Sequence, residues 1–406
     1  MGIDAVTCNA MKRFSALIIL GILLAAGQAR VHAAPAPSDW PSLNADAAQT
    51  NWNQGEHTLS AANVLKISPK WVAPAADTVG YPVAAGRDVF VPFVSGKHAY
   101  VHELDGVSGK LIATYTKEAF GGMVFSAGSL YLAGYHLQEI DPATGSQVAV
   151  IDAAPRLPRG AFIMPLADRS IILAGYTDLS LHAPHVANTL YAFSSDLSQR
   201  LWHAPSLRAQ GSIVAGHVFT ETTSGAAGYD ERTGRHTFSR QLLHGAWFGG
   251  GRLNYAVGTL GTSPLTLFAY AGSGRRVWSR VVGPRLNVQD WPHASTGTLI
   301  YLQTLLPRAG VEAVDPATGK IVWSEPVPDI QHLALANNVL YALTYRLGQP
   351  VRLALLRADT GKIIGSKVLQ AGYFAFPSLN NMMVANGMVY LRLEGPQGSQ
   401  LVALGL

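Results

Sequence analysis

Three regularities in the sequence predict an all-β fold, an eight-bladed β-propeller with four-stranded antiparallel blades. A turn ending in glycine recurs, a short apolar strand recurs eight times, and an aromatic residue recurs four positions after the turn glycine. Equivalent points are about 35 to 50 residues apart, which is the length of one propeller blade. No segment has a long helical period, so radially arranged sheets are the simplest way to bury the strands.

The turn is best preserved in residues 311–323, VEAVDPATGKIVW, where Asp315 and Gly319 lie between two apolar strands. Residues 105–109 repeat it, as do Asp141 with Gly145 and Asp230 with Gly234; degenerate copies occur at residues 195–199, 271–274 and 357–361. The Asp side chain accepts backbone N–H groups within such a turn, and Gly supplies the positive φ. Each copy therefore predicts a β-hairpin, and the even repetition favours a turn role for these carboxylates over a metal-ligand role.

The second regularity is an apolar strand that follows a small turn once in each repeat. The copies are Val89-Phe90, Leu130-Tyr131, Ile171-Ile172, Val218-Phe219, residues 253–255, residues 299–301, residues 339–341 and residues 388–390. Eight copies predict eight blades.

The third regularity is an aromatic residue on the outermost strand of the blade. Trp278, Trp323 and Phe238 follow the turn glycine by four residues, and Trp202 has the matching place in a degenerate copy, whereas Ala113, Ala149 and Gly365 stand there in the weaker copies. These rings could be stacking platforms for bases or sugars. Their regular placement instead favours packing between blades.

The last repeat predicts how the ring closes. It ends at residues 401–406, LVALGL, with no outer strand after it. An unpaired edge is a liability that a closed ring removes, and residues 65–74, with Trp71 at the aromatic position, have the character of the missing strand. We therefore expect residues 65–406 to form the propeller. Residues 34–64 are expected to form an arm lying over it, with one helical turn near residues 60–64 capped by Ser60.

The amino terminus predicts export. An apolar run at residues 14–26 follows Met11-Lys12-Arg13 and precedes Val31-His32-Ala33. A short basic region, an apolar core too short to cross a bilayer and small residues before the cut describe a signal peptide. We expect residues 1–33 to be that peptide, with the true start at Met11, cleavage after Ala33 and a periplasmic or secreted product.

The single cysteine, Cys8, lies before the expected cleavage point. A mature chain without thiols excludes disulfides, thiolate catalysis, cysteine zinc sites and lipid attachment through cysteine. The remaining chain has no apolar run long enough for a transmembrane helix.

The charge balance argues against nucleic acid. Lys and Arg number 30 against 25 Asp and Glu, for a formal charge of +5. No basic run is interleaved with aromatic residues as a nucleic-acid groove requires. We expect a monomer whose partner is a protein or a small ligand.

The intact pattern at residues 313–323 resembles the repeat of pyrroloquinoline-quinone (PQQ) type β-propellers, and the resemblance extends over residues 40–406. That family includes quinoprotein alcohol dehydrogenases and the propeller subunit of the outer-membrane protein assembly machinery. The resemblance implies the fold. In the dehydrogenases it implies a quinone held between a tryptophan and a disulfide of adjacent cysteines, with Ca²⁺ bound by acidic and amide side chains.

This chain departs from that pattern by lacking a mature cysteine and by its shorter length, although some members lack the disulfide. The assembly subunit is closer in size but normally carries a lipid-modified cysteine.

Candidate site residues lie where the repeat is broken at the first strands of the blades. These strands line the channel, and the loops before them form one mouth. Polar or large side chains replace the small apolar ones at Arg159, His244, Trp247, Asp290, Trp291, His293 and His332. They predict a pocket with His293 and Asp290 as polar contacts and Trp247 and Trp291 as walls. The plainer interpretation, which we favour, is a satisfied channel histidine and ordinary core aromatics.

The remaining sequence patterns indicate function more weakly. His182 and His185 could begin a metal site, but without a third ligand nearby an exposed loop is favoured. No nucleophile elbow, phosphate loop, zinc-protease or dinucleotide motif has a fitting context, and no carboxylate pair indicates glycan processing. The first hypothesis is therefore a non-catalytic extracytoplasmic binding scaffold that needs no cofactor. The second is a PQQ- and calcium-dependent oxidoreductase, or a degenerate relative of one.

Overall fold

The computed structural model describes residues 39–74, 81–95, 98–115, 122–152, 160–168, 171–178, 188–206, 211–222, 225–241, 243–260, 263–284, 291–305, 307–369, 382–395 and 398–406. All of them belong to one unit, residues 34–406. The predicted signal peptide, Cys8, His182 and His185 lie outside these residues. Within them, no helix has the length and apolar character needed to cross a membrane.

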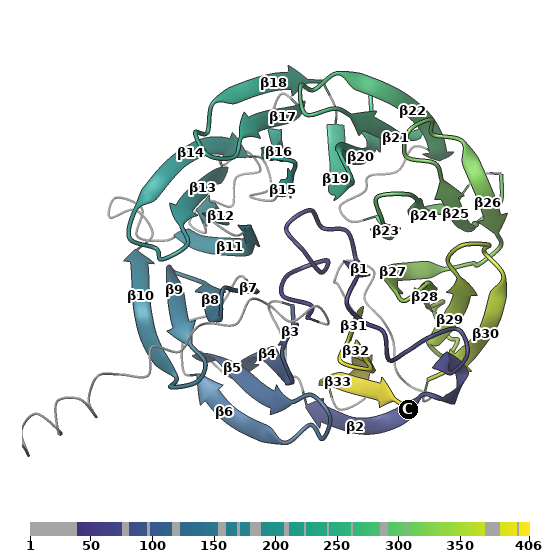
Figure 1. Ribbon diagram of the computed structural model, residues 1–406, viewed down its shortest axis with the longest axis horizontal. Coiled ribbons are helices and arrows are strands. Elements are labelled where there is room, and N and C mark those ends of the chain that lie inside the picture. The colour runs from purple at the N-terminus through teal and green to yellow at the C-terminus, as the bar shows by residue number, and fades with distance from the viewer. Residues whose placement is uncertain are drawn as a thin grey trace, which may run out of the picture. The chain divides into compact units, whose positions relative to one another are not determined.

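The predicted fold is confirmed, because the described strands form eight blades of four antiparallel strands around a ring (Figure 1), and one blade also pairs with the short β1 (Trp52–Asn53) in parallel. Blade one comprises β3 (Val83–Ala85), β4 (Asp88–Ser95), β5 (His98–Asp105) and β6 (Leu111–Tyr115). Blade two comprises β7 (Gly122–Ser126), β8 (Ser129–Ala133), β9 (His136–Asp141) and β10 (Ser146–Asp152). Blade three comprises β11 (Gly160–Asp168), β12 (Ile171–Asp178), β13 (Asn188–Ser194) and β14 (Arg200–Ser206). Blade four comprises β15 (Gly211–Val214), β16 (His217–Thr222), β17 (Gly225–Asp230) and β18 (His236–Arg240).

The second half of the ring continues the same order from the axis outward. Blade five comprises β19 (Leu243–Gly250), β20 (Leu253–Thr259), β21 (Leu265–Tyr270) and β22 (Arg276–Gly283). Blade six comprises β23 (His293–Ser295), β24 (Ile300–Thr304), β25 (Gly310–Val314) and β26 (Ile321–Glu325). Blade seven comprises β27 (Ile330–Ala336), β28 (Val339–Thr344), β29 (Arg352–Arg357) and β30 (Ile363–Val368). Blade eight comprises β31 (Met382–Ala385), β32 (Met388–Gly395), β33 (Gly398–Gly405) and, outermost, β2 (Ser68–Pro74).

The recurring turns join the third and fourth strands, as predicted. At Asp315 the carboxylate accepts the N–H groups of Ala317 and Thr318, each at 2.8 Å, and the Gly319 N–H donates to the Asp315 carbonyl. Gly319 has φ +70°, which a side chain would disfavour. The Asp315 carboxylate thus takes part in the turn, as the turn interpretation of the repeated Asp residues expects.

Outer-strand tryptophans lock four of the blades to the blade that follows. The indole N–H groups of Trp71, Trp202, Trp278 and Trp323 donate to backbone carbonyls in the turn of the following blade, over 2.7–3.0 Å. Their rings lie so close to the turn glycines that a Cβ on Gly234 or Gly319 would come within 3.0 Å of the ring. In blade one the place predicted for Ala113 is filled instead by Tyr115, whose hydroxyl donates to the Pro142 carbonyl.

Ring closure occurs as expected, because β2 pairs antiparallel with β33 from Ser68 opposite Gly405 to Pro74 opposite Gln400. The first and last strands of the propeller thus share one sheet. The edge left by residues 401–406 is covered by the segment containing Trp71.

The expected turn near residues 60–64 is present, because the Asn63 and Val64 N–H groups donate to the Ser60 carbonyl, but Ser60 does not cap it. A 3₁₀ helix, η1 (Val64–Lys66), follows Asn63, and no side chain caps it. The Ser60 N–H instead donates to the side-chain oxygen of Asn63 at 2.8 Å. Ser60 and Asn63 therefore exchange the expected roles, because the amide oxygen of Asn63 reaches the orphan N–H of Ser60.

Candidate functional site

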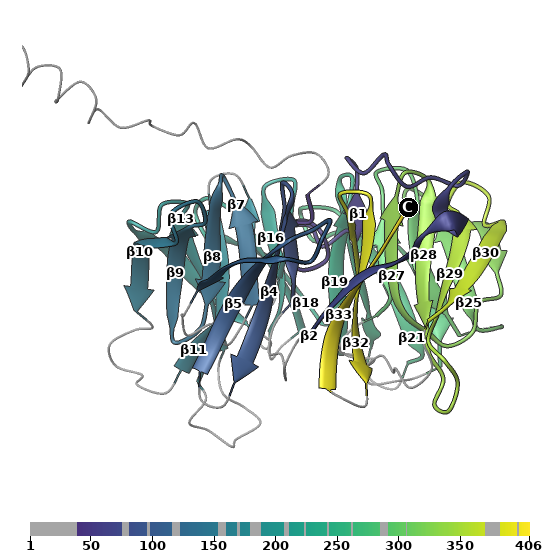
Figure 2. The ribbon, with the colours of Figure 1, turned by 90° about the horizontal axis from the view of Figure 1, so that it is seen from below.

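The arm, residues 39–59, crosses one end of the channel (Figures 1 and 2). The innermost strand of each blade is an edge strand. Its N–H and C=O groups that do not pair with the second strand face the channel axis and need partners. The arm supplies them with its own backbone. The arm therefore extends the hydrogen bonding of the inner strands.

The arm meets the inner strands in ring order. Trp40 exchanges two backbone hydrogen bonds with Ala84 of β3, each at 2.9 Å. Further along, the inner-strand N–H groups of Phe125, Ile213, Gly249, Ser295 and Leu335 donate to the carbonyls of Pro41, Ala47, Ala48, Thr50 and Asn51, over 2.6–2.8 Å. β1 (Trp52–Asn53) then pairs parallel with β27, and the Asn53 amide donates to the Val384 carbonyl of β31. Seven blades are linked through one segment.

His293 lies at the centre of this contact. Its Nε2 is 2.8 Å from the Gln49 carbonyl of the arm, and its Nδ1 is 2.7 Å from the Trp291 carbonyl. The ring stacks on Phe248 with centroids 4.0 Å apart, and the Asn51 amide donates to the His293 carbonyl. Burial lowers the pKa of His293, whereas the two carbonyls favour the cation and act in the opposite direction. The imidazole thus clamps the arm to blade six.

Glu56 fixes the far end of the arm. Its carboxylate accepts the N–H of Gly387 in the turn of blade eight at 2.6 Å and the N–H groups of Thr58 and Leu59 within the arm. The side chain is 1% exposed. Three N–H donors compensate its desolvation, so this buried acid serves to hold the arm.

Asp46 shapes the apex of the arm. Its carboxylate accepts the backbone N–H of Thr50 at 2.9 Å and the Thr50 hydroxyl at 2.6 Å. Removal from water raises the pKa of Asp46 to about 6, against the opposing effect of these hydrogen bonds. The apex therefore contains a carboxyl group that changes charge near neutral pH.

The structure brings only part of the predicted pocket set together. Trp291 and His293 adjoin through the hydrogen bond described above, and the Trp291 indole donates to the Gln303 carbonyl at 2.9 Å. Trp247 packs in the cluster of Phe219, Phe238 and Tyr270. His332 is buried in β27.

The remaining predicted residues are not placed. Arg159 and Asp290 lie outside the described residues, and His244 is in β19 with its side chain outside the description. The pocket with His293 and Asp290 as paired contacts consequently stays a prediction.

Sequence reasoning missed the arm residues that hold the inner strands, above all Gln49, Asn51 and Glu56. The signal was present, because residues 39–64 are rich in Asn and Ala and have no regular period. Polar side chains without a period suit a segment that satisfies sheet edges one residue at a time. Their partners, such as His293 for Asn51, are 242 residues away, which no local pattern reveals.

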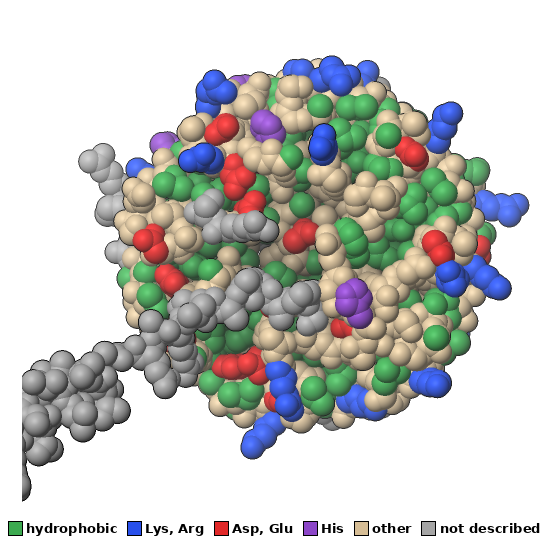
Figure 3. Space-filling model, in the orientation of Figure 1, with side chains coloured by type: hydrophobic (Ala, Val, Ile, Leu, Met, Phe, Trp, Pro, Cys, Tyr) green, Lys and Arg blue, Asp and Glu red, His purple; other side chains and the backbone are tan. Residues whose placement is uncertain are grey.

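The face that carries the arm shows Lys and Arg mainly around its rim (Figure 3). Among the described residues, no three His, Cys, Asp or Glu side chains are grouped so as to hold a metal ion.

The ring of eight four-stranded blades, closed by an amino-terminal strand, defines the chain as an eight-bladed β-propeller. The sequence matches no family profile and no curated protein.

Solved structures match in fold. A quinohemoprotein alcohol dehydrogenase from Pseudomonas putida HK5 is 11% identical with TM-score 0.66, over 91% of this chain and 80% of that one. A europium-containing methanol dehydrogenase is 11% identical with TM-score 0.62, over 91% and 98%. BamB from Moraxella catarrhalis is 13% identical with TM-score 0.56, over 84% and 100%. The predicted resemblance to quinoprotein and assembly-subunit propellers is confirmed at the level of fold.

Proposed function

We propose that this chain is an extracytoplasmic propeller that acts as a rigid scaffold, binding a protein or small ligand without catalysis of its own. The observation that carries the proposal is the use of the polar groups at the arm end of the channel. His293, Asn51 and Glu56 all have backbone partners that join the arm to the blades. Side chains used in this way stabilise a fixed shape.

The proposal assigns binding to the opposite end of the ring, where the chain enters the inner strands. Arg159, His244 and Asp290 precede or begin such strands, and their side chains break the repeat. The proposed export route is the signal peptide of residues 1–33, which would deliver the propeller to the periplasm or medium.

Site-specific photocrosslinking tests the binding end. A photoreactive residue replaces Arg159 or Asp290, and the control replaces Arg252 or Thr298, which are exposed in the turns at the arm end. The proposal predicts defined adducts in intact cells from positions 159 and 290 only. Adducts of equal yield from the arm-end positions would contradict it.

The second candidate function is tested on the purified chain beginning at Ala34. It is titrated with PQQ in the presence and absence of Ca²⁺, and absorbance and alcohol-dependent dye reduction are followed. We expect no turnover. Quinone binding with dye reduction would replace the scaffold function with that of a quinone-dependent oxidoreductase.

A further inference from the structure

The junction between blades seven and eight lacks the aromatic lock, and it differs from the other junctions in a second way. In blade seven the position four residues after the turn glycine is Gly365, where the preceding blade has Trp323. The following blade offers no turn to receive a ring, because its third strand ends at Gly405 and its fourth begins at Ser68. Leu65 of η1 covers the glycine, so closely that a Cβ there would lie 2.6 Å from Leu65 Cδ2. The repeat is therefore interrupted where the two chain ends meet.

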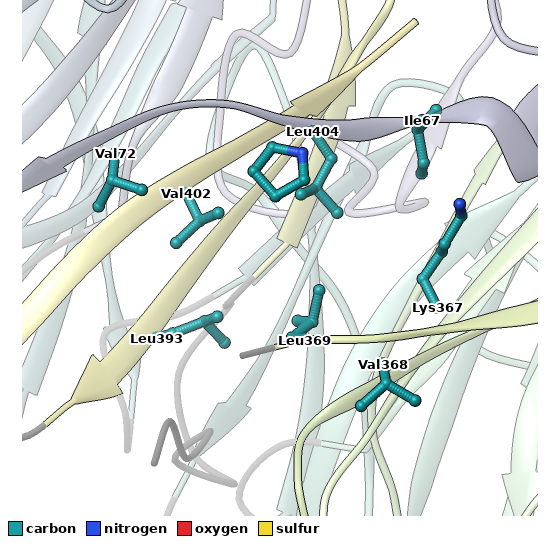
Figure 4. A pocket seen from close by; sticks show the side chains of 9 residues that line it. Ile67, Val72, Lys367, Val368, Leu369, Leu393, Val402 and Leu404 are labelled. Carbon is teal, nitrogen blue, oxygen red and sulfur yellow. The ribbon is translucent and has the colours of Figure 1, made fainter. Parts of the chain in front are cut away.

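An apolar cavity of about 110 Å³ opens beside this interruption, between β30 and the face of blade eight. We call it the seam pocket. Leu393, Val402 and Leu404 line it with buried side chains, whereas Val72 on β2 is 50% exposed at its margin. Figure 4 shows side chains of the two blades facing one another across this space. The pocket thus has an apolar floor and an open side.

Of the described residues that line the seam pocket, Lys367 alone is charged. It lies on β30, and its ammonium has no ion-pair partner within the part of the chain that the structure describes. A cation beside an apolar hollow complements a ligand that has an apolar body and an anionic end. The pocket volume limits the apolar body to one ring, because closed apolar cavities of about 150 Å³ take up benzene and this smaller pocket lets a ring extend through its open side.

We propose that the seam pocket binds a small aromatic carboxylate, with its ring against Leu393, Val402 and Leu404 and its carboxylate at Lys367. The ring would occupy apolar space at a junction where the outer strand, β30, supplies no aromatic side chain. Breaks in a repeat are where binding sites are expected, because the scaffold no longer dictates the residue. This inference is independent of the scaffold function and of the channel end assigned to it.

The probe is 3-phenylpropionate, added to the whole chain beginning at Ala34 and followed by saturation-transfer NMR of its ring protons and by calorimetry. A ligand of this size should bind with a Kd of about 1 mM or lower. Lys367→Met should weaken binding about fivefold, the upper range for one partly exposed ion pair. Lys362→Met, in the turn that precedes β30, is the matched control and should leave the Kd unchanged.

Filling the pocket provides the second test. Val72→Trp places an indole at the open side and should abolish the signal. Val148→Trp makes the same exchange on β10, where Val148 is 59% exposed and far along the chain from the seam, and should preserve binding. A thermal melt of each variant confirms that it is folded. Absence of saturation transfer in the unmodified chain, equal affinity for 3-phenylpropionamide, or retained binding in folded Val72→Trp would each overturn the proposal.

Discussion

At the scale of single residues, the outer-strand tryptophans combine apolar burial with one directed hydrogen bond. Trp202 is 7% exposed, its indole donates to the Glu231 carbonyl at 2.7 Å, and its ring stacks near Tyr229. Gly234 can receive the ring because it has no Cβ and adopts φ +66°. The turn and the tryptophan are thus two parts of one contact between blades.

Trp202→Ala should destabilise the propeller by about 3 kcal/mol, the range for loss of a large buried aromatic. Urea unfolding of the chain beginning at Ala34, followed by far-UV circular dichroism, measures it. Leu201→Ala on the same strand is the control, because Leu201 is 38% exposed and should cost under about 1 kcal/mol. A loss for Trp202→Ala as small as that of the control would contradict the locking role.

The carboxyl of Asp46 predicts a pH dependence of arm docking. Its folded pKa of about 6 lies above the ordinary value of 3.8, so the folded chain holds this proton more tightly than the unfolded chain. The stabilisation is therefore complete below about pH 4 and is lost as the pH rises through 6. His293 acts in the opposite direction, because its lowered pKa removes stability as the pH falls below its ordinary 6.5.

Asp46→Asn isolates the first effect, since the amide keeps the shape but does not titrate. We expect this variant to gain stability relative to the unmodified chain by about 1–2 kcal/mol between pH 4 and pH 7. The difference between their free energies of unfolding, measured at several pH values, is the readout. A difference that is constant across this range would show that Asp46 does not titrate near 6.

At the scale of elements, the arm covers inner edges that would otherwise be open. Residues 40–53 accept inner-strand N–H groups of six blades, and the Asn53 amide donates to the Val384 carbonyl on the inner strand of blade eight. Edge strands without partners exchange with solvent and invite other strands. The arm therefore protects the axis of the ring.

Deleting the arm, with the chain beginning at Val64, should leave the outer hairpins folded and expose the inner edges. Hydrogen exchange should accelerate at the amides of Ile213, Gly249, Ser295 and Leu335, whose acceptors are removed. The amide of Gly319 is the internal control, because it donates to Asp315 within its own turn. Unchanged protection of the four inner amides would contradict the role assigned to the arm.

At the scale of the whole molecule, ring closure couples the two ends of the propeller. Repeat proteins contact only their neighbours, and an open array loses cooperativity at its ends. Here β2 pairs with β33 and Trp71 reaches the Gly106 carbonyl of blade one, so no blade is terminal. The ring should unfold as one unit.

Comparing a chain that begins at Val64 with one that begins at residue 75 tests closure apart from the arm. Both lack residues 39–63, but only the second lacks β2. We expect one cooperative urea transition for the first, and for the second a lower midpoint, a shallower slope and concentration-dependent association through the bare edge of β33. Equal midpoints and slopes would contradict closure by β2.

The sequence by itself determined the blade count, the strand order within a blade and the closing strand. These follow from local chemistry, because an Asp side chain, a positive-φ glycine and an aromatic four residues later lie within one hairpin, as at Asp315, Gly319 and Trp323. The contacts of the candidate site could not be predicted in the same way. The sequence singled out His293 as a break in the repeat, but its partner Gln49 is 244 residues away and contributes only a backbone carbonyl.

Only the tertiary structure decided what the arm and the seam do. Any residue can offer a carbonyl, so no pattern in residues 39–59 identifies Ala84, Ser295 or Leu335 as their partners. In the sequence, Gly365 is only a weak copy of the repeat. The structure shows that the two ends of the propeller lie beside it and that an apolar cavity adjoins them. Hairpins depend on neighbours in sequence, whereas the docking of the arm and the seam pocket depend on segments that are joined only when the ring closes.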